Sequence, residues 1–348
     1  GIETNSQLGH AAYTVTEDGR LYYLSGGNTV ETNQAGQIIW LDKNGQNAEV
    51  ILESQVYGHI ALSPDETRIA LTIFESGGTS DIWVWDIDRK TLGRRTFEGK
   101  ASRPTWTADG NKLIYTYGSE GLRTVASNGT EPARTIFASN VITNISGVAP
   151  SGEIIFDTGS PKSTYLLDPN YDSNSEMVAE QIDLAPTVHI AHRSHVSPDG
   201  NWISYVSMET GLPQIYVRPF PNIYDGKWQI STEPSGQPIW SPSSNEIFYW
   251  TVDNRQFSVP FEITQQGNSE QIGVIEFGTP QLSFSRQGQR DLARFPAWDY
   301  SETRERFLFI ERQGGSGNTI EDALASQTSL VVVENWLEEL ASLAPPDN

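Results

Sequence analysis

The sequence predicts an all-β fold, a single β-propeller of four-stranded antiparallel blades. One short phrase, an apolar strand followed by a polar turn and a second apolar strand, recurs seven times. Its turns begin at Thr16, Ser63, Thr107, Ala149, Ser197, Ser241 and Asp299. The steps of 47, 44, 42, 48, 44 and 58 residues lie within or near the period of about 40–50 residues that is typical of propeller blades. Thirty Gly and 19 Pro suit many turns, and ten Trp, 13 Tyr and 13 Phe provide apolar area for packing sheet on sheet.

The first three repeats separate into four strands each by apolar alternation and turn residues. The first repeat contains AAYTVT, RLYYLS, QIIWLD and AEVI. The second contains HIALS, RIALTI, DIWVWDID and RRTF, and the third contains RPTWT, KLIYTY, LRTVAS and ARTIF. This regularity predicts antiparallel blades in which sequential strands are neighbours.

The later repeats are less uniform. The third strand of the fourth repeat is only TYLLD, and the sixth repeat carries the longest insertion, residues 264–278. The seventh has three strands, RFPAW, RFLFIE and SLVVVEN, followed by WLEELASLAPP, which is the pattern of a short amphipathic C-terminal helix. Residues 1–9 are the free segment that we expect to supply its fourth strand.

We therefore predict seven blades, with six blades and an irregular closure as the alternative. All blades are expected to form one domain over residues 1–348. Its repeats start near residues 10, 57, 102, 142, 190, 236 and 293.

Composition narrows the class of protein. Lys and Arg total 23 against 44 Asp and Glu, a formal charge of −21, so we expect no nucleic-acid partner. Cysteine is absent, which excludes disulfides and thiolate metal sites. No apolar stretch reaches the roughly 20 residues of a membrane span, so we expect a soluble chain that does not insert into a membrane. It opens GIETNSQ without an initiating Met, as expected for a mature product or an excised segment with an anchor upstream.

Several segments resemble TolB-type propellers, and more narrowly the C-terminal propellers of bacterial transmembrane serine/threonine kinases and related regulators. The main one is QIYVRPFPNIYDGKWQISTEPSGQPIWSPSSNEIFYW, residues 214–250. In the same order come SDIWVWDIDRKTLGRRTF, SPDGNWISYVSMETG, GTPQLSF and VVVENWLEEL. The resemblance covers nearly the whole chain and implies a periplasmic or extracellular module with an undefined ligand. No kinase motif is present, and the family offers no catalytic residues to transfer.

The strand before each turn is expected to line the central channel. The position four residues upstream of the turn start holds Ala12, His59, Arg103, Ile145, Arg193, Gln237 and Phe295. With their polar neighbours, they predict a channel site made of His10, His59, Arg103, Asn144, His192, Arg193, Gln237 and Arg294. Imidazole and guanidinium groups suit a small anionic or saccharide ligand. A wet channel without a dedicated ligand is the alternative.

The sequence offers two candidate sites for a divalent cation as cofactor. Imidazoles in the channel, with Gln237 as an oxygen ligand, suit a transition metal. Asp168, Asn170 and Asp172 place oxygen ligands at every second residue, which calcium favours. The second pattern is incomplete, because Ser173 stands where a calcium-binding EF-hand loop needs Gly. An acidic surface turn is therefore the competing interpretation.

The sequence favours a non-enzymatic propeller that binds a ligand or a protein partner, as an extracytoplasmic sensor or scaffold module. It contains no Gly-x-Ser-x-Gly nucleophile elbow, so the hydrolase half of a prolyl-oligopeptidase-like protein is missing. The alternative is a channel-centred lyase or hydrolase that acts on acidic saccharides, with or without a metal ion.

Overall fold

The structure is a computed structural model of the chain. It describes residues 35–75, 77–141, 143–158, 163–168, 180–182, 184, 191–243, 245–264, 273–286 and 297–312. It also describes the backbone of residues 4–5, 10–11, 13–15, 21–25 and 329–333, and of 191–192 only the backbone is described. The chain divides into two compact units, one made of residues 1–33 and 315–348 and the other of residues 34–314.

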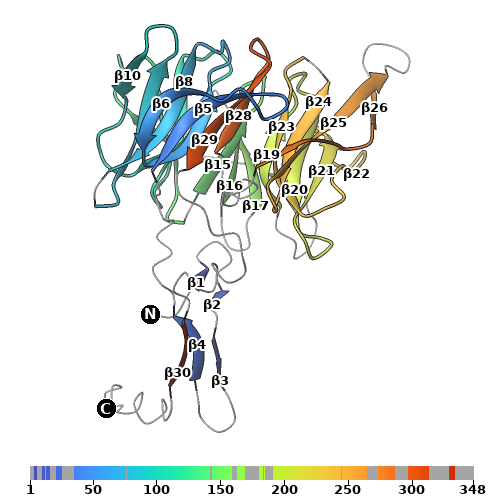
Figure 1. Cartoon of the computed structure of the whole chain (residues 1–348), viewed down its shortest axis with the longest axis horizontal. Helices are drawn as coiled ribbons and strands as arrows, with labels where there is room; N and C mark the ends of the chain where they lie inside the picture. The colour runs from blue at the N-terminus through green and yellow to red at the C-terminus, as the bar shows by residue number, and fades with distance from the viewer. Residues whose placement is uncertain are drawn as a thin grey trace. The chain divides into compact units, whose positions relative to one another are not determined.

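Residues 34–314 form a propeller whose described strands make six antiparallel sheets, which we number as blades I to VI (Figure 1). Blade I contains β7 (Tyr57–Leu62), β8 (Arg68–Phe74), β9 (Ser80–Asp86) and β10 (Thr91–Arg94). Blade II contains β11 (Ala101–Trp106), β12 (Lys112–Tyr117), β13 (Gly121–Ala126) and β14 (Arg134–Ala138). Blade III contains β15 (Thr143–Val148), β16 (Ile154–Thr158), β17 (Ser163–Leu167) and β18 (Glu180–Ile182).

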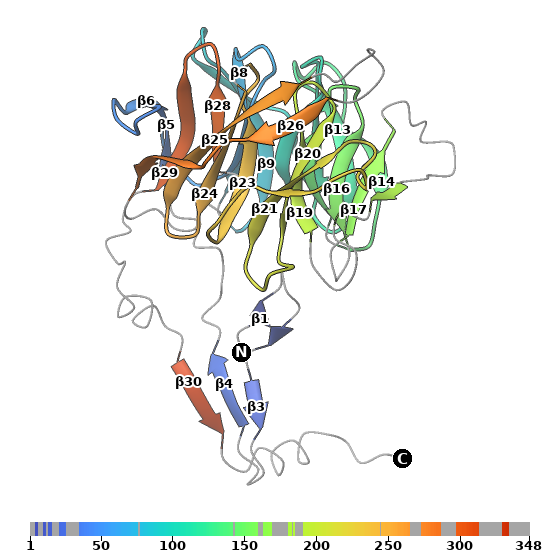
Figure 2. The same ribbon diagram turned by 90° about the vertical axis from the view of Figure 1, so that its right-hand side faces the viewer.

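Blade IV contains β19 (Ala191–Val196), β20 (Trp202–Ser207), β21 (Gln214–Pro219) and β22 (Trp228–Gln229). Blade V contains β23 (Ser235–Trp240), β24 (Glu246–Thr251), β25 (Arg255–Thr264), β26 (Val274–Phe277) and β27 (Gln281–Ser285). The long strand β25 pairs with β27 along its first part and with β26 along its last part. The hairpin of β25 and β26 therefore projects beyond the rest of the blade at the right-hand side of Figure 1, the side that faces the viewer in Figure 2.

Blade VI closes the ring with strands from both ends of the unit. β28 (Trp298–Ser301) and β29 (Arg306–Arg312) pair with β5 (Gly36–Asp42) and β6 (Glu49–Gln55). The ladder between β29 and β5 runs without interruption from Arg306 opposite Asp42 to Arg312 opposite Gly36. Ile38, Ile39 and Leu41 of β5 are fully buried, so this strand belongs inside a sheet with both faces covered.

The predicted propeller of four-stranded antiparallel blades is confirmed, with the alternative number of six blades instead of seven. The sequence suggested one blade too many because the strands of its first repeat are divided between the two units. Its segments QIIWLD and AEVI complete blade VI in the places where we expected SLVVVEN and residues 1–9. The expected third strand, SLVVVEN, pairs with Leu21–Ser25 instead. The apolar face of β5 explains this outcome, because residues 1–9 have no comparable apolar pattern.

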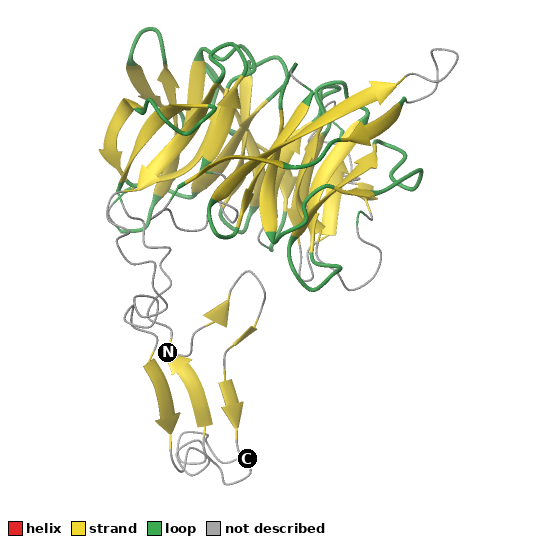
Figure 3. Ribbon diagram, turned by 45° about the vertical axis from the view of Figure 1, so that its right-hand side comes forward, coloured by secondary structure: helices red, strands yellow, loops and turns green. Residues whose placement is uncertain are grey.

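The other unit holds the remaining part of the first repeat. β3 (Tyr13–Val15), β4 (Leu21–Ser25) and β30 (Ser329–Val333) form a three-stranded antiparallel sheet. β1 (Thr4–Asn5) pairs with β2 (His10–Ala11). The predicted C-terminal helix at WLEELASLAPP lies outside the described residues. In the part of the chain that is described, the ordered elements are strands (Figure 3).

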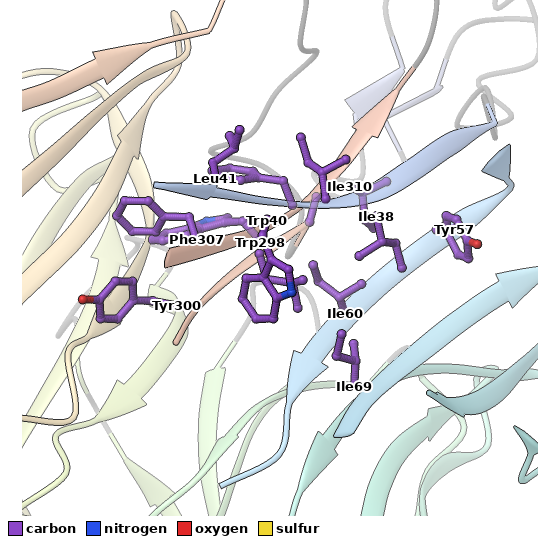
Figure 4. Close-up of a cluster of buried hydrophobic side chains, with 14 of the residues drawn as sticks. Ile38, Trp40, Leu41, Tyr57, Ile60, Ile69, Trp298, Tyr300, Phe307 and Ile310 are labelled. Atoms are coloured by element: carbon purple, nitrogen blue, oxygen red, sulfur yellow. The ribbon is translucent and has the colours of Figure 1, made fainter. Parts of the chain in front are cut away.

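The largest buried cluster joins blades V, VI and I. Trp298 of β28 lies among apolar side chains of β5 and β7, including Trp40 and Ile60 (Figure 4). On the blade V side, Trp250 meets Trp298 and Phe309 in edge-to-face contacts at ring-centroid distances of 6.2 and 5.4 Å. Burial of such large rings makes the closing blade part of the core.

Candidate functional site

The first strand of each blade stands next to the ring axis. β7, β11, β15, β19 and β23 contact one another in this order, and β28 contacts β7. Five of these inner strands contain a one-residue register shift, a β-bulge. In four of them the bulge encloses a predicted channel residue: His59, Arg103, Arg193 and Gln237.

Three of these residues have an unusual backbone. Arg103, Arg193 and Gln237 have φ angles of 54°, 57° and 53°. The left-handed region costs a non-glycine residue about 1–2 kcal/mol, and it persists when the surroundings hold it. Because the three positions are equivalent and share this conformation, their polar side chains leave the inner strands in the same direction relative to each strand.

Side chains of the preceding blade hold two of the bulges. Thr72 Oγ1 accepts a hydrogen bond of 3.1 Å from the backbone N–H of Arg103. Asp157 Oδ2 accepts a bond of 3.1 Å from the N–H of Arg193. The Asp157 side chain is buried, and its two oxygens also accept 2.8 Å bonds from the hydroxyls of Ser146 and Thr164.

Two indoles tie neighbouring inner strands together. Trp106 Nε1 donates to the carbonyl oxygen of Ala61 at 2.9 Å, and Trp240 Nε1 donates to that of His195 at 3.0 Å. These bonds join blade I to blade II and blade IV to blade V. The bulged segments are therefore set in a rigid frame.

His59 is buried, with 6% of its surface exposed. Neither ring nitrogen has a hydrogen-bond partner among the described residues. Burial lowers its pKa well below the usual value, and the positive charges of Arg103, Arg312 and Arg193 lower it further. The imidazole is therefore neutral at pH 7, and three guanidinium groups lie close enough to act on it.

Gln237 is equally buried, with 5% of its surface exposed. Its amide oxygen and nitrogen have no partner within the described part of the chain. Buried polar groups in proteins are nearly always hydrogen bonded. His59 and Gln237 thus have hydrogen-bonding capacity that the described protein groups do not use.

Arg312 was missed in the sequence because it ends a second strand, β29, instead of lying on an inner strand. Its Nη2 donates to the carbonyl oxygen of Tyr57 at 3.4 Å, which brings the guanidinium to the inner strand of blade I. The available signal in the sequence was that Arg312, a charged residue, directly follows the largely apolar run FLFIE.

The other predicted site residues are placed less fully. Asn144 is half-buried on β15 and lies opposite Asp157 in the ladder. His192 lies on β19, but its side chain is outside the described set, as is that of His10 on β2 of the other unit. Arg294 is not among the described residues. The channel site as a whole therefore stays a prediction.

The cation sites also stay predictions. Asp168 follows β17 and is exposed, whereas Asn170 and Asp172 fall in the range 169–179, which is not described. Among the described residues, no group of three or more His, Asp or Glu side chains is arranged to hold a metal ion.

A second polar cluster, also missed from the sequence, joins blade I to the turn 299–304 of blade VI. Glu66 ends the turn Ser63–Pro–Asp–Glu and has a φ of 55°. Its carboxylate accepts bonds from the Ser301 hydroxyl at 2.5 Å, from the Glu302 N–H at 2.9 Å and from both the N–H and the hydroxyl of Thr303. Although burial opposes it, hydrogen bonds from Ser301 and Thr303 hold the pKa of Glu66 below its usual value.

Asp299 of the same turn is half-buried, and the pKa of its carboxyl shifts in the opposite direction to that of Glu66. Its Oδ2 accepts a bond of 2.7 Å from the N–H of Leu62. Burial raises the pKa of this carboxyl to about 6, although the bonds from Leu62 and Tyr300 oppose the rise. Together with Glu66, it makes two carboxyl groups that secure the closing blade.

Solved structures with a similar fold include two assigned to TolB. The structure from Agrobacterium tumefaciens has a TM-score of 0.58 and 15% sequence identity, and the match covers 81% of this chain and 99% of that one. TolB from Acinetobacter baumannii has a TM-score of 0.51 and 19% identity, covering 78% of this chain and 82% of that one. No family model matches the sequence, and no curated protein does.

The TolB-type resemblance of the sequence is thus confirmed at the level of the fold. The narrower likeness to kinase propellers stays a prediction. Within the described residues, no helix has the length and apolar content needed to cross a bilayer.

Proposed function

We propose that this chain is a non-enzymatic binding propeller that takes a small anionic ligand on its ring axis. The observation that carries the proposal is the pair His59 and Gln237, two buried side chains without hydrogen-bond partners among the described residues. The charges of Arg103, Arg193 and Arg312 act on the same imidazole. Binding sites in proteins combine a few convergent polar groups with a rigid scaffold in this way.

Charge favours an anion over a cation at this place. Guanidinium groups bind carboxylates through charge-assisted and often bidentate hydrogen bonds. His59 is held neutral by burial and by its cationic neighbours, so it does not itself attract the anion from a distance. The arginines supply the charge, and the imidazole and the amide supply neutral contacts.

We place the module outside the cytoplasm, as a sensor or scaffold. This proposal rests on the TolB-type fold and on the sequence resemblance that covers nearly the whole chain. A protein partner that binds the outer strands of the blades is compatible with an axial ligand, because the axial residues lie on or beside the inner strands.

The alternative is a lyase or hydrolase for acidic saccharides. One observation favours it: a neutral buried imidazole beside guanidinium groups can accept a proton next to a bound carboxylate. Turnover must therefore be measured together with binding.

The test is a calorimetric and thermal-shift screen of carboxylates, sugar acids, oligouronates, C-terminal peptides and divalent ions. It compares the wild type with Arg103→Gly and Arg193→Gly, which suit the left-handed backbone at these positions. Lys90→Gly is the matched control, because Lys90 is an exposed cation with a φ of 52°.

A specific ligand at one hundred times its Kd raises the free energy of unfolding by about 2.7 kcal/mol. We expect an anion to stabilise the wild type and the Lys90→Gly variant, and to lose most of this effect in both axial variants. If no compound depends on Arg103 or Arg193, the axial site is refuted. Release of an unsaturated or shortened saccharide would replace the binding function with the enzymatic one.

A further inference from the structure

We propose that the axial ligand presents one carboxylate with hydroxyl groups beside it, the chemistry of a hydroxy acid or sugar acid. This inference rests on the proposed function and names the ligand class for the same site. It follows from the arrangement of charged and neutral groups around the ring.

The charged and neutral bulge residues are segregated around the axis. Arg103 of blade II and Arg193 of blade IV flank blade III. His59 of blade I and Gln237 of blade V flank blade VI, which is three blades further round the six-bladed ring. A ligand that spans the axis therefore meets two bulge guanidiniums on one side and two neutral bulge side chains on the other, where Arg312 of blade VI also reaches blade I.

The charge balance on the arginine side favours a single negative charge. The buried carboxylate of Asp157 accepts the backbone N–H of Arg193 and lies beneath that side. It offsets part of the positive charge of the two guanidiniums. A guanidinium forms bidentate bonds with carboxylate and phosphate alike, so the reduced positive charge beside Asp157 is the reason to favour the singly charged carboxylate.

The neutral side favours hydroxyl groups. A neutral imidazole has one donor nitrogen and one acceptor nitrogen, and the amide of Gln237 also offers donors and an acceptor. A hydroxyl group is likewise both donor and acceptor, so vicinal hydroxyls can satisfy both side chains. Burial of these atoms makes an unmatched ligand costly.

The net charge of the chain disfavours a long polyanionic ligand. At −21, the surface as a whole repels a long polyanion. A free sugar acid or the end of an acidic polysaccharide offers the same carboxylate and hydroxyls at the axis. The length of the ligand distinguishes these two sources.

The experiment is isothermal titration calorimetry at pH 7 with a matched set of probes. D-Galacturonate and D-gluconate carry both groups, D-galactose lacks the carboxylate, and cyclohexanecarboxylate lacks the hydroxyls. Inorganic phosphate, trigalacturonate and a tripeptide with a free C-terminus complete the set. The variants are Arg103→Gly, Gln237→Met and the control Lys90→Gly, each first verified as folded by circular dichroism and thermal melting.

We expect a sugar acid to bind at least tenfold more tightly than D-galactose and cyclohexanecarboxylate. Arg103→Gly and Gln237→Met should each weaken this binding about tenfold or more, the loss of roughly one matched hydrogen-bonded contact. Gln237→Met should leave cyclohexanecarboxylate unaffected, because that probe has no hydroxyl for the amide. Trigalacturonate that binds more tightly than the monomer would support the inference with a chain end as the source.

Several outcomes would overturn the inference. If phosphate, the tripeptide or cyclohexanecarboxylate binds as tightly as the sugar acids, and this binding depends on Arg103, the ligand class is wrong and the proposed binding function stands. If no anion shows binding that depends on Arg103, both the ligand class and the proposed function fail.

Discussion

Replacing Glu66 with glycine tests how the ring is closed. Glycine is the residue that the repeat itself suggests, because Gly110 and Gly200 hold the same place in their turns, with φ angles of 67° and 78°. A repeat-based argument would therefore predict that Glu66→Gly stabilises the protein. The contacts of Glu66 with the turn 299–304 predict the reverse.

The expected magnitude follows from two opposing effects. Glycine relieves the left-handed strain of about 1–2 kcal/mol, but it loses about 0.5–1 kcal/mol in backbone entropy. Against this small gain stand the bonds from Ser301, Glu302 and Thr303 to the carboxylate. A hydrogen bond to a charged group contributes about 1.5–3 kcal/mol, and some of these donors can turn to water. We expect a net loss of about 2–3 kcal/mol in the free energy of unfolding.

The assay is urea unfolding followed by tryptophan fluorescence, with Glu66→Gly compared with Glu305→Gly. Glu305 is exposed and has a φ of 49°, so its replacement relieves the same strain and removes only its charge interactions with Lys43 and Tyr300. The control should be unchanged or more stable by up to about 1 kcal/mol. If Glu66→Gly were as stable as the control, the carboxylate would not hold the closing blade and the reasoning would be wrong.

Three further predictions concern buried polar groups. Burial raises the pKa of Asp299 to about 6, above its unfolded value, so its contribution is complete below pH 4 and is lost as the pH rises through 6. Asp299→Asn should remove up to about 3 kcal/mol of this dependence, and parallel unfolding curves for the two proteins across pH 4–7 would contradict it. The pKa of His59 is lowered instead, so the wild type should lose stability relative to His59→Gln as the pH falls below 6.5; the same urea series measures this difference. Gln237→Met removes a buried amide without a described partner and should stabilise the ligand-free protein by about 1–2 kcal/mol. The matched change Gln256→Met removes an amide whose Nε2 donates a 3.0 Å bond to the carbonyl of Phe257 but whose Oε1 has no described partner. It should therefore stabilise the protein less than Gln237→Met does, and equal melting temperatures for both variants would count against this account.

Local sequence predicted the inner strands well because each turn and the bulge before it span a fixed number of residues. Counting back from Ser63, Thr107, Ser197 and Ser241 therefore identified His59, Arg103, Arg193 and Gln237. The same alternation could not show that two of these residues lack hydrogen-bond partners among the described residues, since hydrogen bonding depends on the neighbouring blades.

Contacts between distant segments account for what the sequence did not reveal. The phrase at residues 14–25 looks like a blade, but β3 and β4 pair with β30 instead of with β5. The pairing of β5 with β29 joins residues far apart in the chain, and no local pattern encodes such a partner. Arg312 and Glu66 were missed for the same reason, because their partners, Tyr57 and the turn 299–304, belong to other blades.

The closing blade also determines when the axial cluster can exist. Blades I to V are each built from consecutive strands, so they can fold as the chain leaves the ribosome. β28 and β29 are the last strands of the propeller to emerge, and only then does β5 acquire its partner and Arg312 reach blade I. A ligand held between blades would resist opening of this final joint, so occupancy of the axis and persistence of the ring become one linked equilibrium. Slow exchange of amide hydrogens in β5 would then report ligand binding from a strand that contributes no residue to the axial site.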